Sequence, residues 1–262
     1  MSARAKWKKQ FLAEHPHCCF CGGQVKSAEP DHIPSRALFE NRQWPEGYVF
    51  PACELCNRVS RHDEQVVALI SRLYPDGNSE TREKEFQERV RAVAYNYPEV
   101  IQEMKLSVRQ ARNAIKKYQL ELPSGTSSAD FPAVFAGGHL VNAAVTIFAR
   151  KLFCALYYKH TQAILPPTAG IAIQWFTNIQ VETGAIPTAL AEVLGGLPEL
   201  VRCNTSLHDQ FFYRYVTSDC CRLAAFLVFF RQSFAILGYV NVDADDFKIA
   251  DRASIYRPFS HG

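Results

Sequence analysis

The sequence predicts an α+β protein with three parts: a small cysteine-rich domain at 1–78, an amphipathic helical connector at 79–120, and a C-terminal α+β domain with an antiparallel sheet at 121–262. Three observations support this division. Two Cys-x-x-Cys pairs lie in the first part, apolar residues with helical spacing fill the second, and three β-rich runs lie in the third. With 262 residues, 48% of them hydrophobic, the chain can bury a substantial core.

The four paired cysteines are the strongest local signal. Cys18-x-x-Cys21 and Cys53-x-x-Cys56 can each form a tight knuckle, and together four thiolates can enclose one tetrahedral zinc ion. Cys19 is an alternative ligand, but only Cys18 and Cys21 have the spacing of the second pair. The contrasting interpretation is four buried free thiols. A zinc ion with four sulfur ligands has no open position, so we expect it to be structural.

The connector is predicted from its apolar spacing. Residues that recur every three or four positions between 80 and 120 are Phe86, Val90, Val93, Tyr97, Ile101, Met104, Val108, Ala111 and Ile115. They predict two helices that meet just before Pro98, since proline is tolerated in the first turn of a helix. The polar stretch 123–130 then predicts a linker or long loop.

The C-terminal part is predicted to begin with a helix over about 138–160, followed by a turn at Pro166 and Pro167. Later come three runs rich in Phe, Tyr, Val, Leu and Ile, at 210–217, 223–230 and 234–242. Short polar breaks separate them, which is typical of an antiparallel meander.

Charge and apolar content bear on location and partners. The net charge of +3 permits a nucleic-acid partner without requiring one. No apolar segment follows the lysine-rich N-terminus, and charged residues interrupt the longest apolar stretches, so we expect neither a signal peptide nor a membrane span. The expected location is the cytoplasm. Disulfides do not persist there, which favours metal binding by the clustered cysteines.

Asp31, His32 and Asn57 accompany the cysteine pairs in a specific order. Asp31-His32-Ile33-Pro34 lies between the pairs, and Asn57 directly follows the second one. This order resembles the HNH, or His-Me finger, endonucleases, in particular the zinc-knuckle type of phage recombination endonuclease VII. The resemblance covers about 11–64. A second resemblance, to bacterial HNH-type proteins with an appended α+β region, rests on 51–60 and the segment from Asp31 to Phe39.

The resemblance implies a zinc-stapled ββα fold and metal-dependent cleavage of phosphodiester bonds. Asp31 and Asn57 would hold a catalytic Mg²⁺ or Mn²⁺ ion, and His32 would be the general base. The chemistry is consistent, since a neutral imidazole can take a proton from water and carboxylate and amide oxygens suit Mg²⁺. His62 is a further catalytic candidate, although a solvated helix-face histidine is the simpler interpretation. Taken alone, Asp31-His32 could be a capped turn and Asn57 a helix cap.

One position departs from the family pattern. Tyr48 stands where these nucleases usually have an asparagine that braces the catalytic histidine, a role that Asn41 or a backbone carbonyl could take over. This departure motivates a second hypothesis: a catalytically silent zinc module that binds nucleic acid or a protein. A third hypothesis makes the C-terminal domain a sensor or partner interface that controls the nuclease, as in bacterial defence. The sequence does not predict the oligomeric state.

The expected partner of the leading hypothesis is nucleic acid, with double-stranded DNA favoured over RNA. Arginines that could contact its phosphates are Arg36, Arg42, Arg58, Arg61 and Arg72. The lysine-rich N-terminus would join them, although ordinary solvated arginines explain the same pattern.

Overall fold

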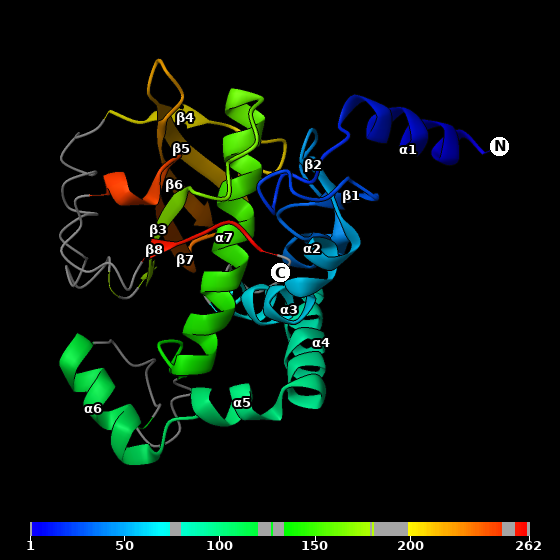
Figure 1. Ribbon diagram of the computed structural model, residues 1–262. Helices are drawn as coiled ribbons and strands as arrows, with labels where there is room; N and C mark the ends of the chain where they lie inside the picture. Colours follow the sequence, from blue (N-terminus) through cyan, green and yellow to red (C-terminus); the bar gives the residue numbers. More distant parts are fainter. Residues whose placement is uncertain are drawn as a thin grey trace.

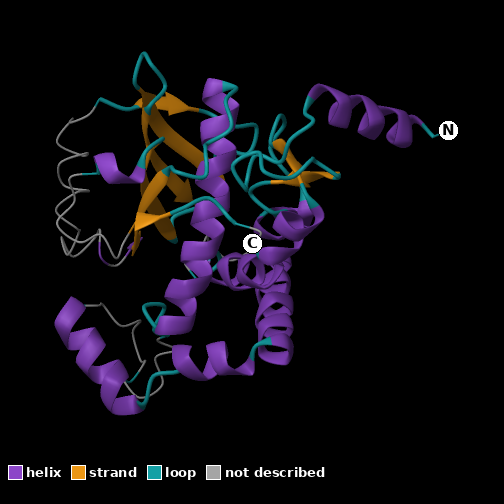
Figure 2. Cartoon of the chain, viewed as in Figure 1, coloured by secondary structure: helices purple, strands orange, loops and turns teal. Residues whose placement is uncertain are grey.

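The computed structural model describes residues 2–73, 80–119, 127, 134–178, 180, 199–247 and 255–260. It shows a mixed α+β fold in which a long helix, α7 (His139–Thr161), lies between a six-stranded antiparallel sheet and the cysteine-rich module (Figure 1). Figure 2 shows the connector helices along the lower side of the molecule, from below the module to below the sheet, and the N-terminal helix extending at the upper right. The predicted linker at 123–130 lies outside the described residues except for Ser127.

The cysteine-rich module contains a two-stranded hairpin followed by two helices. Its elements are α1 (Ala3–Glu14), β1 (Glu29–His32), the 3-10 turns η1 (Arg36–Leu38) and η2 (Glu40–Arg42), β2 (Val49–Ala52), α2 (Glu54–Val59) and α3 (Arg61–Ile70). Strands β1 and β2 pair antiparallel, with Asp31 opposite Phe50 and His32 opposite Val49. Helix α1 has no buried residue and extends away from the body (Figure 1).

The connector forms three helices rather than the two that the apolar spacing predicts. They are α4 (Glu80–Asn96), α5 (Pro98–Met104) and α6 (Val108–Tyr118). Pro98 occupies the first turn of α5, which confirms the predicted break. The additional break has a local cause, because Ser107 and Gln110 form a reciprocal capping box that starts a new helix at Val108.

The large sheet has the strand order β4-β5-β6-β7-β3-β8. Its strands are β3 (Gly170–Thr177), β4 (Val201–Cys203), β5 (Phe211–Thr217), β6 (Leu223–Phe230), β7 (Phe234–Asn241) and β8 (Ile255–Tyr256), and the 3-10 turn η3 (Ala244–Asp246) follows β7. Strands β5, β6 and β7 confirm the predicted meander, since each pairs antiparallel with the next. Strand β3 pairs with the far side of β7 and widens the sheet.

Helix α7 is the central element of the core. Among the described helices, it alone is long and apolar enough to cross a membrane, but 67% of its most apolar window is buried inside the protein. Most of this window therefore packs against the rest of the protein. Phe148 contacts Phe230 and Phe153 stacks on Phe226, so one side of the helix packs on the sheet.

The module and the sheet share one buried apolar cluster, which includes Phe20, Ile33 and Phe39 of the module and Phe211 of β5. A polar chain also joins the two parts. The Tyr48 hydroxyl donates to the Tyr213 hydroxyl at 3.0 Å, and the Tyr213 hydroxyl lies 2.7 Å from Nε2 of His160. The module is thus packed onto α7 and the sheet.

Gly238, in the middle of β7, should not tolerate a larger residue, because a Cβ atom there would overlap the ring of Phe153. We expect Gly238→Ala to lower the free energy of unfolding by about 1–3 kcal/mol through overpacking. Chemical denaturation checks this value. The double variant Gly238→Ala/Phe153→Leu should recover part of the loss relative to Phe153→Leu alone, and a strictly additive double variant would contradict the contact.

Stability should also depend on His160. Burial, reinforced by Lys159, lowers the pKa of His160 to about 4. The unfolded chain, with an ordinary histidine pKa of about 6.5, therefore binds more protons than the folded protein between these values. The contribution of His160 is full above about pH 6.5 and is lost as the pH falls towards 4.

Denaturation of zinc-saturated protein at pH 7 and pH 5 measures this effect. We expect His160→Gln to reduce the pH 5 loss by about 1 kcal/mol, after allowance for solvent around the half-buried ring. Equal losses in the variant and the wild type would show that His160 is not responsible.

Candidate metal centre and active site

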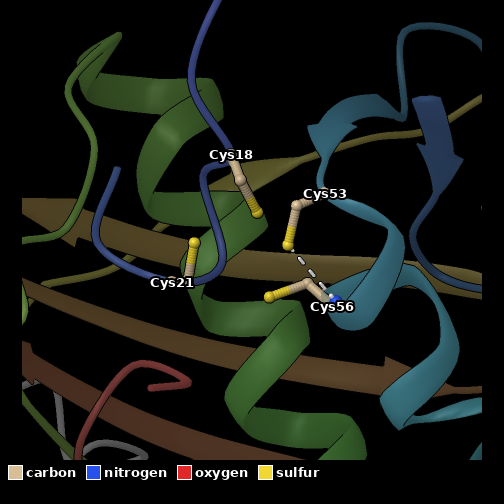
Figure 3. A group of neighbouring side chains, drawn as sticks. All are labelled: Cys18, Cys21, Cys53 and Cys56. Carbon is tan, nitrogen blue, oxygen red and sulfur yellow. Dashed lines mark hydrogen bonds between the residues drawn. The ribbon is translucent and has the colours of Figure 1, made fainter. Parts of the chain in front are cut away.

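The two cysteine pairs meet at one point. The Sγ atoms of Cys18, Cys21, Cys53 and Cys56 lie within 4.8 Å of one another, and all four residues are buried. Figure 3 shows the two pairs facing each other from the loop after α1 and from the start of α2. The predicted ligand set is therefore assembled, and it can hold a structural metal such as zinc.

Local backbone geometry explains how each pair forms its knuckle. After Cys21 the chain turns through Gly22 and Gly23, whose φ angles of +67° and +74° favour glycine. In the second pair, Cys53 is the N-cap of α2, and its Sγ accepts a hydrogen bond from the Cys56 N–H at 3.4 Å (Figure 3). Both sulfurs of that pair are thereby held at the same helix end.

The donor chemistry fits zinc. A tetrahedral ion with Zn–S bonds of about 2.3 Å needs sulfurs about 3.8 Å apart, which the cluster can adopt with small side-chain movements. Hydrogen bonds from the Cys18 and Cys56 thiols lower the pKa of Cys21, whereas hydrogen bonds to Cys18 and Cys21, together with burial, raise the pKa of Cys56, so the four thiols do not all ionise together in the absence of a cation. A divalent cation would allow all four to ionise together.

Cys19 lies outside the cluster although it is adjacent in sequence. It is fully buried, and its backbone N–H donates to the Pro51 carbonyl at 3.0 Å. Burial and the nearby Cys18 raise the pKa of its thiol well above the ordinary value. Cys19 is a protonated core residue, and Cys18 and Cys21 are the members of the first pair, as the spacing predicts.

Asp31 makes a contact that the sequence did not predict. Its Oδ2 atom lies 2.6 Å from Nζ of Lys151, whose side chain is fully buried in α7. The two side chains form an ion pair, although the angle between the Lys151 ammonium and Asp31 Oδ2 does not meet the criteria for a hydrogen bond. Burial raises the pKa of Asp31 to about 6, with the Lys151 ammonium opposing the shift and Glu64 adding to it.

His32 ends β1 at the edge of the module. Its Nε2 lies 2.8 Å from Nη2 of Arg36, so this nitrogen accepts and the ring proton is assigned to Nδ1. The Arg36 guanidinium stacks 3.6 Å over the Trp44 ring, which meets the His32 ring edge-on. Burial, with Arg36 and Arg4, lowers the pKa of His32 to about 4, so the imidazole is neutral at neutral pH.

Asn57 and His62 lie further along the chain, on α2 and α3. Asn57 is half-buried in α2, and its side chain forms no hydrogen bond with a described residue. His62 is exposed, and its ring meets Tyr97, at the N-cap of α5, edge-on at a centroid distance of 5.1 Å. Asn41 donates its backbone N–H to Glu85, whereas Arg36 and Trp44 contact the His32 ring.

The predicted phosphate-binding arginines separate into two groups. Arg36, Arg42, Arg58 and Arg61 are exposed or half-buried. Arg72 is different, because its side chain is 6% exposed and its guanidinium pairs with Glu85 at 3.4 Å. Arg72 is therefore a structural residue, and the expectation that it contacts phosphate is wrong for this conformation.

Lys151 is the residue that the sequence analysis missed. Its signal was a lysine at 151 that follows Arg150 in the middle of a mostly apolar helix, a position that requires a counter-charge when it is buried. The spacing along the helix indicates burial but does not identify the partner.

Comparison of the chain with protein-family models, with curated proteins and with solved structures gives no match.

Substitution within the first cysteine pair tests the metal centre. Cys21→Ala should lose the bound zinc and much of the thermal stability, because a structural zinc ion supplies on the order of 10 kcal/mol of folding free energy. Cys19→Ala, equally buried and two residues away, should keep about one zinc per chain. Zinc content and thermal midpoint measure both variants. A Cys21→Ala protein that keeps its zinc would contradict the assignment.

Proposed function

We propose that this protein is an endonuclease of the HNH type that hydrolyses phosphodiester bonds in DNA, with His32 as the general base. The observation that carries the proposal is the placement of His32. It is a neutral imidazole at the end of β1. Strand β1 pairs with β2, which leads directly into Cys53, the N-cap of α2. The element order β1, β2, α2 supports the proposal of a ββα domain of this kind.

His32 and Arg36 divide the chemistry between them. The oxygen of a water molecule attacks the phosphorus atom while Nε2 of His32, which Arg36 releases when it turns to the phosphate, takes up a proton from that water. The bond from phosphorus to the 3′-oxygen breaks, and the departing oxygen takes a proton from solvent. Arg36, beside His32, binds a phosphoryl oxygen through its guanidinium and offsets the negative charge that develops there.

A divalent ion would be held by the carboxylate of Asp31 and the amide oxygen of Asn57. Both are hard oxygen donors suited to Mg²⁺ or Mn²⁺. Asp31 Oδ2 is buried, with no hydrogen-bond donor of good geometry among the described residues, so a cation suits it. Its ion pair with Lys151 is the competing contact. When bound, such an ion supplies charge neutralisation at the phosphate and help for the departing oxygen.

The surface around His32 supports nucleic acid as the substrate. Arg4, which lies close enough to lower the His32 pKa, belongs to the exposed helix α1 with Lys6, Lys8 and Lys9. Trp7 and Trp44 are 48% and 40% exposed and can stack on bases. Double-stranded DNA in the cytoplasm is the proposed target, and control by the C-terminal sheet would suit a role in bacterial defence.

A second candidate function is a catalytically silent module that binds nucleic acid. Two observations favour it. Tyr48, in the position of the usual bracing asparagine, is buried and directs its hydroxyl to Tyr213. Lys151 already neutralises the carboxylate that a catalytic ion would need.

Cleavage of supercoiled plasmid distinguishes the two functions. The wild type with Mg²⁺ or Mn²⁺ should nick or linearise the plasmid. His32→Ala should cut roughly 10²–10⁴-fold more slowly, the usual loss of a general base. The control His208→Ala, which removes an exposed histidine outside the proposed site, should retain near wild-type activity. Undiminished cleavage by His32→Ala would refute the mechanism, and binding without cleavage in Mg²⁺, Mn²⁺ and Ni²⁺ would support the silent module.

A further inference from the structure

Lys151 lies at the centre of a buried polar cluster from which the proposed chemistry uses Asp31 alone. Its Nζ is 2.6 Å from Asp31 Oδ2, 2.9 Å from Ser60 Oγ and 3.5 Å from Glu64 Oε1. Ser60 also donates to Glu64 Oε1 at 2.6 Å. Strand β1, helix α3 and its N-cap Ser60 thus contribute oxygens to one ammonium group from α7.

The charges of this cluster explain why Lys151 is buried. An isolated ammonium in the core would be strongly disfavoured, but two carboxylates lie within 4 Å of this one. Two carboxylate oxygens at 2.6 and 3.5 Å and the Ser60 hydroxyl at 2.9 Å from Nζ are the surroundings that a charged ammonium requires. Lys151 carries one positive charge, and the Asp31 and Glu64 carboxylates each carry one negative charge. The three groups together therefore have a net negative charge.

The oxygens around Nζ are also the kind that bind a hard divalent cation. Carboxylate and hydroxyl oxygens are suitable ligands for Mg²⁺ and Mn²⁺. The Lys151 ammonium occupies the space between them. An ammonium group and a metal ion cannot both lie at bonding distance from Asp31 Oδ2 in this space, because the two cations repel each other.

We propose that Lys151 is a built-in cation that competes with a divalent metal ion for Asp31, so that the position of α7 controls metal loading. The inference rests on the proposed function, which treats Asp31 as a metal ligand. Lys151 is a positioning residue: it is fully buried and does not reach a substrate. It keeps the Asp31 carboxylate in place when no metal ion is bound.

The packing of α7 gives this competition a structural consequence. Phe148 and Phe153, on either side of Lys151 in the sequence, contact Phe230 and Phe226 of β6. The Tyr157 hydroxyl donates to the Cys221 carbonyl in the turn before β6 at 2.7 Å. A displacement of the sheet would therefore move α7 and withdraw Lys151 from Asp31, which links the C-terminal domain to the metal site.

Direct Mn²⁺ binding by the zinc-saturated full-length protein tests the proposal. Electron paramagnetic resonance of the free ion gives the affinity without any need for catalysis. We expect Lys151→Met to bind Mn²⁺ at least about tenfold tighter than the wild type, because no ammonium competes for Asp31 in this variant. A tenfold change in affinity corresponds to about 1.4 kcal/mol of binding free energy. The double variant Lys151→Met/Asp31→Asn should lose this gain. Lys116→Met, which removes an exposed lysine of α6, should bind like the wild type.

Lys151→Gln is the second variant, because its polar side chain can still bond to Ser60 if the methionine variant does not fold. The inference would be overturned if the wild type bound Mn²⁺ as tightly as the Lys151 variants do. It would also be overturned if the double variant with Asp31→Asn kept the increased Mn²⁺ affinity. Plasmid cleavage by the same samples separates the two proposals. Tighter Mn²⁺ binding without cleavage in any sample supports the role of Lys151 and contradicts the nuclease. Cleavage by a wild-type protein that already binds Mn²⁺ as tightly as the Lys151 variants supports the nuclease and contradicts the role of Lys151.

Discussion

The meeting of two cysteine pairs at one point is the constraint on which the N-terminal module depends. Its two strands have four residues each, and the loop after α1 and the start of α2 are brought together at four sulfur atoms. Because Cys53 caps α2 directly after β2, fixing the sulfurs also fixes the hairpin. The hairpin in turn sets the positions of Asp31 and His32, so a structural metal ion at these sulfurs would determine the geometry of the candidate site.

Helix α7 is the second organising element, and it connects this site to the rest of the fold. Its aromatic residues pack on β6, and its lysine reaches across to β1. A buried ion pair is weak evidence for stability, since removing two charges from water costs about as much as their attraction returns. The Lys151–Asp31 pair is better explained by specificity, because it fixes one carboxylate at one place relative to the zinc-bound hairpin.

Local patterns predicted much of this structure, and long-range partners account for what they missed. The Cys-x-x-Cys spacing identified the cluster, and the aromatic and β-branched runs identified β5, β6 and β7. Strands β4 and β8 have three and two residues, too few to show a pattern, and they exist because a neighbouring strand pairs with them. Lys151 looked like a polar interruption of an apolar helix, because its partner Asp31 is 120 positions away. A periodic pattern shows which side chains are buried but not what they meet.

We propose that the surface around His32 binds nucleic acid. Two of the three tryptophans can report such binding, because they lie at different places in the fold. Trp44 lies against His32 and Arg36, whereas Trp175 donates its indole N–H to Asn142 at 2.7 Å, away from this surface on β3. Nuclear magnetic resonance distinguishes the indole N–H signals of Trp44 and Trp175. Duplex DNA is added in the absence of free divalent ions. We predict that the Trp44 signal shifts in a saturable way while that of Trp175 stays in place. An unchanged Trp44 signal at saturating DNA would contradict the claim.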